Sequence, residues 1–167
     1  MSEAAPLPIC WVCGSRPADT AEHKIKASDV RIVAPRLSAA NPAYLQINSV
    51  ATNKAIASTT SKALAFPTSI CGYCNNTGTQ PYDDAWRRLS KYLHANWRDI
   101  VGRGSFDLTR VFGTDSAAQA LNVHLYFVKL LGCKLNAEKI RVDLSSLSAA
   151  LVARVPHPEI TVLVAKL

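Results

Sequence analysis

Four of the five cysteines in this chain form two Cys-x-x-Cys pairs, Cys10 with Cys13 and Cys71 with Cys74. Each such turn can present two thiolates to one metal ion, and structural zinc sites take four tetrahedral ligands. The segment between the pairs is long, but the entropy of loop closure rises only slowly with length. We therefore predict that these cysteines bind one structural Zn²⁺ ion. A rival ligand set would include His23, and the alternative to a metal is that one pair is redox-active or only buried.

The cysteine content and the apolar segments also indicate where the protein acts. Five cysteines are too few for a secreted disulfide framework, and their spacing is too uneven. Residues 1–8 lack the basic stretch and apolar core of a secretory signal. No segment approaches the roughly 18 to 20 uninterrupted apolar residues of a membrane span. We therefore expect a cytoplasmic protein without a membrane-embedded part, and we expect Cys133 to be a small core residue.

Basic residues cluster around the cysteine pairs. The formal net charge is +7, which suggests a polyanionic partner. Between His23 and Asp83, a single acid, Asp29, stands against six cations: Lys24, Lys26, Arg31, Arg36, Lys54 and Lys62. A second basic group follows the last cysteine pair and begins with Arg87 and Arg88. A solvated basic surface would explain this pattern, but its position around the cysteines favours phosphate binding.

Hydrophobic patterns predict the elements that position these residues. Residues 30–34 and 44–50 are rich in β-branched or alternating apolar side chains, which is typical of strands. Residues 35–42 are predicted to form a loop. Residues 51–62 are compatible with a loop or a weak helix.

The pattern becomes helical after the second cysteine pair. Pro81 and the two aspartates that follow suit a first helical turn, and Gly102 and Gly104 are expected to end the helix. One apolar face is predicted from spacings of three and four, formed by Trp86, Leu89, Leu93, Trp97 and Ile100. Further helices are predicted from 116 to 132 and from 145 to 154, with a closing strand at 160–165. His157, between two prolines, is expected to be exposed.

Three segments together resemble the HNH (ββα-metal) nuclease family in its zinc-stabilised, four-cysteine form. They are Cys10-Trp-Val-Cys13, then Ala21-Glu22-His23-Lys24-Ile25-Lys26-Ala27-Ser28, then Ile70-Cys71-Gly-Tyr-Cys74-Asn75-Asn76. The resemblance covers roughly residues 9–93. It implies that zinc is a scaffold and that DNA is the substrate. It also implies that His23 is the general base, and that Glu22 and Asn75 complete the catalytic site by binding a divalent ion, Mg²⁺ or Mn²⁺.

These observations predict an α+β protein with a zinc-stabilised ββα-metal (HNH-like) motif, a basic insertion and a mainly helical C-terminal half. Residues 1–102 would hold the motif, the insertion and the following helix, and residues 103–167 would form a helical packing region of the same globule. The expected function is metal-dependent hydrolysis of DNA phosphodiester bonds. The alternative is an inactive module that binds nucleic acid or protein. Asn75 could also simply cap a helix, and a homo-oligomer is compatible with the sequence.

Overall fold

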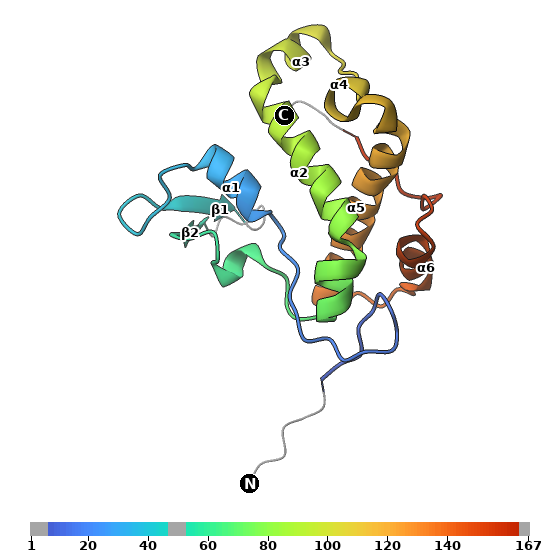
Figure 1. The fold of residues 1–167 in the computed structure, drawn as a ribbon. Coiled ribbons are helices and arrows are strands. Elements are labelled where there is room, and N and C mark those ends of the chain that lie inside the picture. Colours follow the sequence, from blue (N-terminus) through green and yellow to red (C-terminus); the bar gives the residue numbers. More distant parts are fainter. Residues whose placement is uncertain (1–6, 47–52, 164–167) are drawn as a thin grey trace. The chain divides into compact units, whose positions relative to one another are not determined.

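The chain divides into two compact units. A computed structural model describes residues 7–46 and 53–163 (Figure 1). The first unit combines the residues up to Glu22 with those from Pro67 onward, and the second unit is His23–Phe66. Residues on both sides of the expected boundary at 102 belong to the first unit. The predicted mixture of helices and strands is confirmed, whereas the ββα-metal arrangement stays a prediction.

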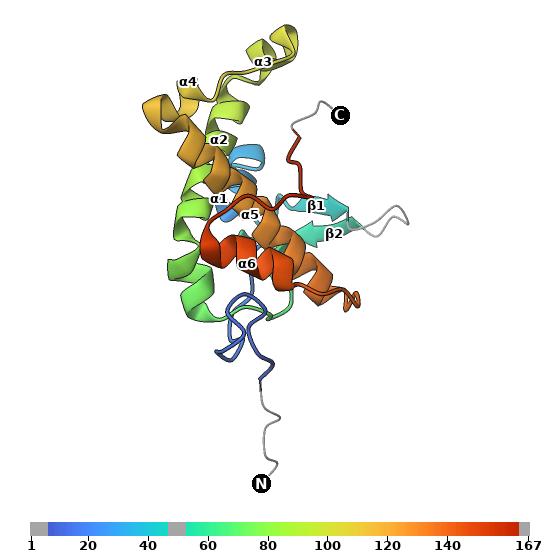
Figure 2. The same ribbon diagram turned by 90° about the vertical axis from the view of Figure 1, so that its right-hand side faces the viewer.

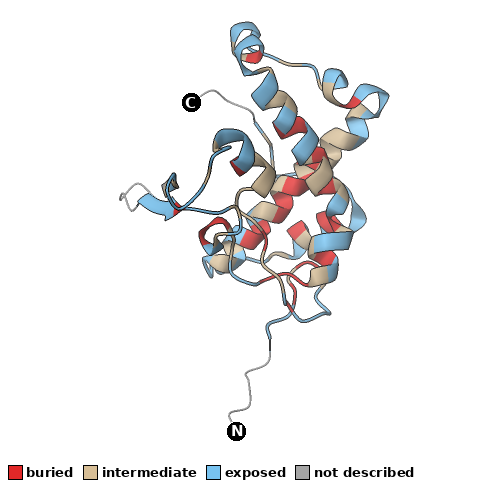
Figure 3. Ribbon diagram, turned by 60° about the vertical axis from the view of Figure 1, so that its left-hand side comes forward, coloured by how far each residue is buried: buried red, intermediate tan, exposed pale blue. Residues whose placement is uncertain are grey.

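Helices dominate the first unit. They are α2 (Gln80–Ala95), α3 (Trp97–Arg103), α4 (Thr109–Phe112), α5 (Ser116–Ala137) and α6 (Ser145–Ala153). In Figures 1 and 2, α2 lies along α5, and α6 packs against α5. Trp86 of α2 stacks on Tyr126 of α5 with ring centroids 5.4 Å apart, and it forms a T-shaped pair with Phe127 at an interplanar angle of 75°. The buried residues, red in Figure 3, lie where these helices face one another.

The helix predicted after the second cysteine pair is interrupted. Asn96 separates α2 from α3, and its side-chain amide donates to the Tyr92 carbonyl oxygen at 2.9 Å. Because of this break, the apolar residues of α3 do not continue the apolar face of α2 at regular helical spacing. Leu89 and Ile100 are buried as predicted, but Trp97 is 43% exposed, so the prediction that it packs in the core is wrong.

Helix α5 continues five residues beyond Gly132, the residue that was expected to end it. Gly132 serves close packing instead, because a Cβ atom at this position would overlap the Trp11 ring. Cys133 is fully buried, as predicted. None of the helices in the described part of the chain is long and apolar enough to cross a membrane.

The segment after α6 packs on the helices without forming the predicted strand over residues 160–163. Residues 164 and 165 lie outside the described residues. His157 is buried rather than exposed. Its backbone N–H donates to His124 Nε2 at 2.9 Å, and its ring lies 3.1 Å from the Ser146 hydroxyl. These contacts attach the segment to α5 and α6, which explains why a residue between two prolines is buried.

The second unit is a small α+β body. Its elements are α1 (Ala27–Val33), a 3₁₀ turn (Lys62–Leu64) and an antiparallel pair of strands, β1 (Ala43–Gln46) and β2 (Asn53–Ile56), in which Ala43 faces Ile56. Its core consists of Val30, Ile56, Ala63 and Leu64. Residues 35–42 form the predicted loop.

Two predictions in the second unit need correction. Residues 30–33 are helical rather than extended. Their β-branched side chains lower helix propensity by only tenths of a kcal/mol (about 0.5 or less per residue), and burial of Val30 outweighs that preference. Residues 53–56 form a strand within the segment expected to be loop or weak helix. The strand predicted at 44–50 is confirmed up to Gln46, and the rest lies outside the described residues.

Candidate metal centre and its surroundings

The structure brings the four paired cysteines together. The sulfur atoms of Cys10, Cys13, Cys71 and Cys74 all lie within 4.8 Å of one another, and all five cysteines of the chain are free thiols. Cys13 Sγ and Cys71 Sγ are 3.9 Å apart. Tetrahedral coordination with Zn–S bonds of about 2.3 Å places sulfurs about 3.8 Å apart. The four cysteines can therefore hold a zinc ion, as the sequence predicts.

Main-chain hydrogen bonds build the first cysteine turn (Cys10–Cys13, the first knuckle). The Gly14 N–H donates to the Cys10 carbonyl oxygen at 2.9 Å. Gly14 has φ of +62°, a backbone conformation that strongly favours glycine. The Cys10 N–H donates to the Arg16 carbonyl oxygen at 2.8 Å, which closes the turn behind the knuckle. These bonds within residues 10–16 give the first knuckle its tight turn.

Backbone pairing brings the second knuckle (Cys71–Cys74) to the first. Thr20 and Ile70 form an antiparallel bridge, and the Thr20 hydroxyl donates to the Ile70 carbonyl oxygen at 2.8 Å. The Asp19 carboxylate accepts the Gly72 N–H at 2.7 Å. These bonds align residues that are some fifty positions apart in the chain, so the fold itself contributes to assembling the ligand set.

The electrostatics of the cluster favour a bound cation. Burial raises the pKa of Cys10 and that of Cys74, which neighbouring thiols raise further. For Cys13, burial acts in the same direction, but hydrogen bonds from Ser15 and from nearby backbone N–H groups outweigh it and lower the pKa to about 6. Close, buried thiolates repel one another without a cation. A Zn²⁺ ion supplies the opposite charge that the thiolate form needs.

The C-terminal helices contact the first knuckle directly, which the sequence patterns do not reveal. The Trp11 ring packs on Gly132 of α5. The Ser148 hydroxyl of α6 donates to the Val12 carbonyl oxygen at 2.6 Å. The helical half is therefore part of the scaffold of the metal centre and not a separate annex.

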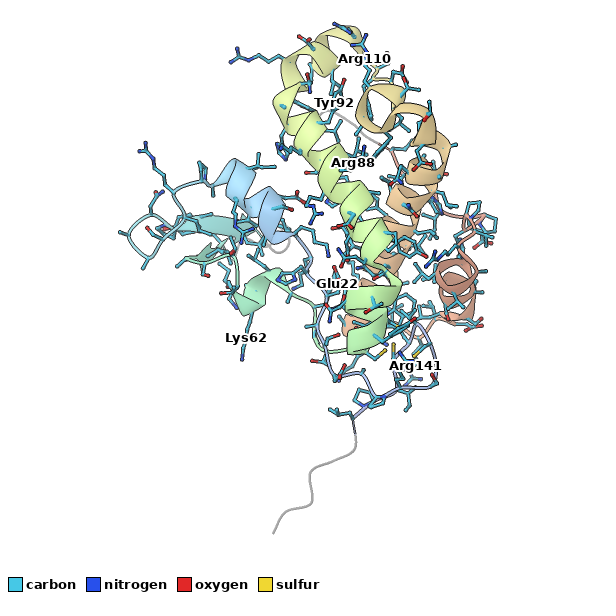
Figure 4. All side chains as sticks on the ribbon, in the orientation of Figure 1. Glu22, Lys62, Arg88, Tyr92, Arg110 and Arg141 are labelled. Atoms are coloured by element: carbon cyan, nitrogen blue, oxygen red, sulfur yellow. The ribbon has the colours of Figure 1, made fainter. Side chains whose placement is uncertain are left out.

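Glu22, an implied ligand of the catalytic divalent ion, lies in the interior of the first unit. It is 1% exposed, and it is labelled in Figure 4 beside the start of α2. Its Oε2 atom is 3.1 Å from Lys129 Nζ. Lys129, which is fully buried, also donates to both carboxylate oxygens of Asp83 at 2.9 and 3.0 Å and to the Thr79 hydroxyl at 3.2 Å. In the sequence, the contact between Glu22 and Lys129 is indicated only by the presence of this lysine among the apolar residues of α5.

This ion pair does not fit a divalent ion on Glu22. An ion bound to that carboxylate would lie next to the ammonium group, and like charges at such distances repel strongly in a buried site. The buried carboxylate already has its counter-charge.

Asn75 connects the second knuckle to the segment that precedes His23. Its side-chain amide nitrogen lies 3.3 Å from both the Thr20 hydroxyl and the Ala21 carbonyl oxygen. Asn75 is in a π-helical turn (Cys74–Gly78), and α2 begins only at Gln80, so a role as cap of α2 does not apply. With its nitrogen used as donor, the amide oxygen is the atom that Asn75 can present to a cation.

His23 begins the second unit, so the unit boundary falls between Glu22 and His23. His23 is half-buried and forms an antiparallel bridge with Ala65. The N–H of the next residue, Lys24, donates to the Leu64 carbonyl oxygen at 2.7 Å. The structure therefore brings Glu22 and Asn75 into the first unit, and the grouping of His23 with them stays a prediction.

The predicted basic residues differ between the units. In the second unit, four of the six cations are exposed, namely Arg31, Arg36, Lys54 and Lys62, and Lys24 and Lys26 are half-buried. In the first unit, the Arg87 guanidinium contacts the Asp84 carboxylate at 2.8 Å. The Arg88 guanidinium donates to the Val111 carbonyl oxygen at 3.0 Å and lies 5.0 Å from the Phe112 ring centre.

Comparison with known proteins gives no match to a protein-family model, to a curated protein or to a solved structure. The sequence motifs and the geometry of the two units therefore carry the functional argument.

Proposed function

We propose that this chain is a zinc-stabilised nuclease of the HNH type that hydrolyses phosphodiester bonds in DNA, with His23 as general base. The observation that carries this proposal is the convergence of the four cysteines. Beside this cluster, the pairing of Thr20 with Ile70 sets the second knuckle against the segment that leads into Glu22. The bonds from Asn75 to Thr20 and Ala21 support it, because the family resemblance requires Asn75 and His23 to act on one phosphate.

His23 would accept a proton from the water that attacks the phosphorus atom. An imidazole has an ordinary pKa of about 6.5, which suits proton transfer near neutral pH. A divalent ion such as Mg²⁺ or Mn²⁺, when bound, would add positive charge at the scissile phosphate, and the Asn75 amide oxygen is a ligand of suitable hardness for it. Zinc, enclosed by four sulfurs, would have no open position for substrate and would act as scaffold.

The second unit would bind the DNA backbone. It carries six cations and one acid, and its exposed cations include Arg31, Arg36 and Lys54. Phosphate contacts of this kind release counterions, so binding should weaken steeply as salt is added.

A second candidate is a module that binds nucleic acid without cutting it. One observation favours it, namely that Lys129 occupies the carboxylate of Glu22, a residue that the resemblance assigns to the catalytic metal. In that case the protein would retain salt-sensitive DNA binding and would lack hydrolysis.

Incubation with supercoiled plasmid separates the two candidates. We expect wild-type protein to nick or linearise plasmid when Mg²⁺ or Mn²⁺ is present and not when EDTA is added. His23→Ala should abolish cleavage while zinc content and DNA affinity are retained, and His94→Ala, at an exposed position of α2, should cleave normally. Cleavage by the His23 variant at the wild-type rate would overturn the catalytic assignment. DNA binding without any cleavage by wild-type protein would favour the second candidate.

A further inference from the structure

A buried ion cluster joins three parts of the first unit. Lys129 Nζ lies within 3.2 Å of oxygen atoms on Glu22, Asp83 and Thr79. Lys129 and Glu22 are almost fully buried, and the Asp83 side chain is 15% exposed. One ammonium group therefore stands between two carboxylates that would otherwise repel each other in the interior.

The three charged residues come from segments that the function has to align. Asp83 lies in the first turn of α2, shortly after the second knuckle. Lys129 lies in α5. Glu22 is the last residue before His23. The cluster thus connects the helical half to the residue that immediately precedes the proposed base.

Two further sets of bonds hold the same short segment. Thr20 pairs with Ile70, and Asn75 binds Thr20 and Ala21 through its amide nitrogen. Lys129 adds a contact at Glu22, so three consecutive residues are fixed one after another. A buried charge pair also requires defined geometry, because an uncompensated charge in the interior is strongly unfavourable.

We infer that Glu22 is a buried partner of Lys129 and not a ligand of the catalytic ion, and that Lys129 is a positioning residue that fixes the segment leading into His23. The effect on catalysis rests on the proposed nuclease function. The ion cluster itself can be tested without it.

The first test is a double-mutant cycle in urea unfolding with Glu22→Gln and Lys129→Met. We expect the two substitutions to be coupled by at least about ten-fold in the unfolding equilibrium constant. Lys134→Met, at an exposed position of the same helix, is the matched control and should show no coupling. Additive effects of Glu22→Gln and Lys129→Met would overturn the inference. If Lys129→Met does not fold, adding Glu22→Gln and Asp83→Asn should restore folding, because the two carboxylates left without Lys129 are then neutral. Failure of the triple variant to fold would also overturn the inference.

The second test uses trypsin, which cleaves after Lys24, next to His23. In the all-neutral variant (Glu22→Gln, Asp83→Asn, Lys129→Met), cleavage after Lys24 should accelerate several-fold, and cleavage after Arg103 in α3 should not change. Equal rates after Lys24 in this variant and in wild-type protein would contradict the positioning role.

The third test separates the two roles of Glu22 in catalysis. If Glu22 positions the segment, Glu22→Gln should lower kcat for plasmid cleavage and leave the Mn²⁺ concentration for half-maximal rate within about two-fold of wild type. A metal ligand would instead raise that concentration by about ten-fold or more, which would overturn the inference. If wild-type protein does not cleave at all, the proposed function fails, and the first two tests still decide the role of the ion cluster.

Discussion

In the first unit, Lys129, Glu22 and Asp83 form a buried ion cluster. The second unit instead carries six cations and one acid, and four of its cations are exposed to solvent. The first unit encloses Lys129 with Glu22 and Asp83, close to a cluster of four cysteines. Among the residues that the structure describes, the core cluster of the second unit has four buried side chains. Charge is thus paired in the interior of one unit and largely exposed to solvent in the other. Under the proposed function, the first unit would position the chemistry and the second unit would bind the DNA backbone.

The largest expected effect comes from breaking the metal centre. Cys71→Ser removes one thiolate from the cluster and should abolish zinc binding. A structural zinc contributes about 10 kcal/mol or more to folding in zinc-finger peptides, so the first unit should lose its cooperative thermal unfolding transition. Elemental analysis and circular dichroism measure both outcomes. Cys133→Ser, at a buried position outside the cluster, should keep one zinc per chain, and loss of zinc from this variant as well would contradict the assigned ligand set.

A smaller effect is expected where the helical half contacts the first knuckle. Gly132→Ala would place a methyl group in the Trp11 ring, and such overpacking reduces the free energy of unfolding by about 1–3 kcal/mol. Gly102→Ala in α3, where the added methyl group meets nothing within 4 Å, should be neutral or slightly stabilising. Urea unfolding distinguishes the two. Equal stability of both variants would show that the helices do not support the metal centre.

The contrast in charge predicts how DNA affinity depends on salt. Lys54→Ala removes an exposed cation on β2 and should reduce the slope of log affinity against log salt by about 0.9, the value for one phosphate contact. Arg87→Ala should change the slope less, because the Arg87 guanidinium already contacts Asp84. Fluorescence anisotropy with a labelled duplex measures both slopes. If the slope falls as much for the Arg87 variant as for the Lys54 variant, both units bind the DNA backbone. The proposed difference in charge between the two units would then be wrong.

The smallest effect concerns pH. Burial lowers the pKa of His124, and the nearby His157 lowers it further. The unfolded chain takes up a proton at this residue near its ordinary pKa of about 6.5, whereas the folded protein resists protonation. This contribution to stability is therefore intact above about pH 6.5 and decreases as the pH falls below it.

His124→Gln keeps an acceptor for the His157 N–H and removes the titration. We expect urea unfolding of this variant to depend less on pH between 7.5 and 5.5 than unfolding of wild-type protein. His94→Gln, at an exposed site, should retain the wild-type dependence. A His124 variant with the wild-type dependence would contradict the assigned cause.

The sequence predicts features that depend on local spacing. The two knuckles, the start of α2 and the position of α6 follow from cysteine, proline and apolar patterns over a few residues. Features that depend on contacts between distant residues were missed. Residues 30–33 are helical because Val30 is buried in a core formed by β2 and the 3₁₀ turn, and β-branched residues alone predict a strand.

The same limit applies to the site. The sequence identifies the four cysteines as candidate zinc ligands, because a repeated Cys-x-x-Cys spacing is typical of structural zinc sites. It also draws attention to Glu22, but nothing near that residue in the chain indicates that Lys129 will be its partner. The two residues are more than a hundred positions apart. The spacing of residues in the sequence therefore predicts which side chains could bind a metal or catalyse a reaction. Contacts between distant segments determine which of these side chains are already paired in the folded protein.

X-ray absorption at the zinc edge of the purified protein tests the central claim most directly, because it reports the type and distance of the atoms bound to the metal. Four equivalent sulfurs at about 2.3 Å are predicted, with an unchanged spectrum for His23→Ala. A nitrogen ligand at about 2.0 Å that disappears in the His23 variant would show that His23 binds zinc. His23 would then be unavailable as the base, and the proposed function would fail.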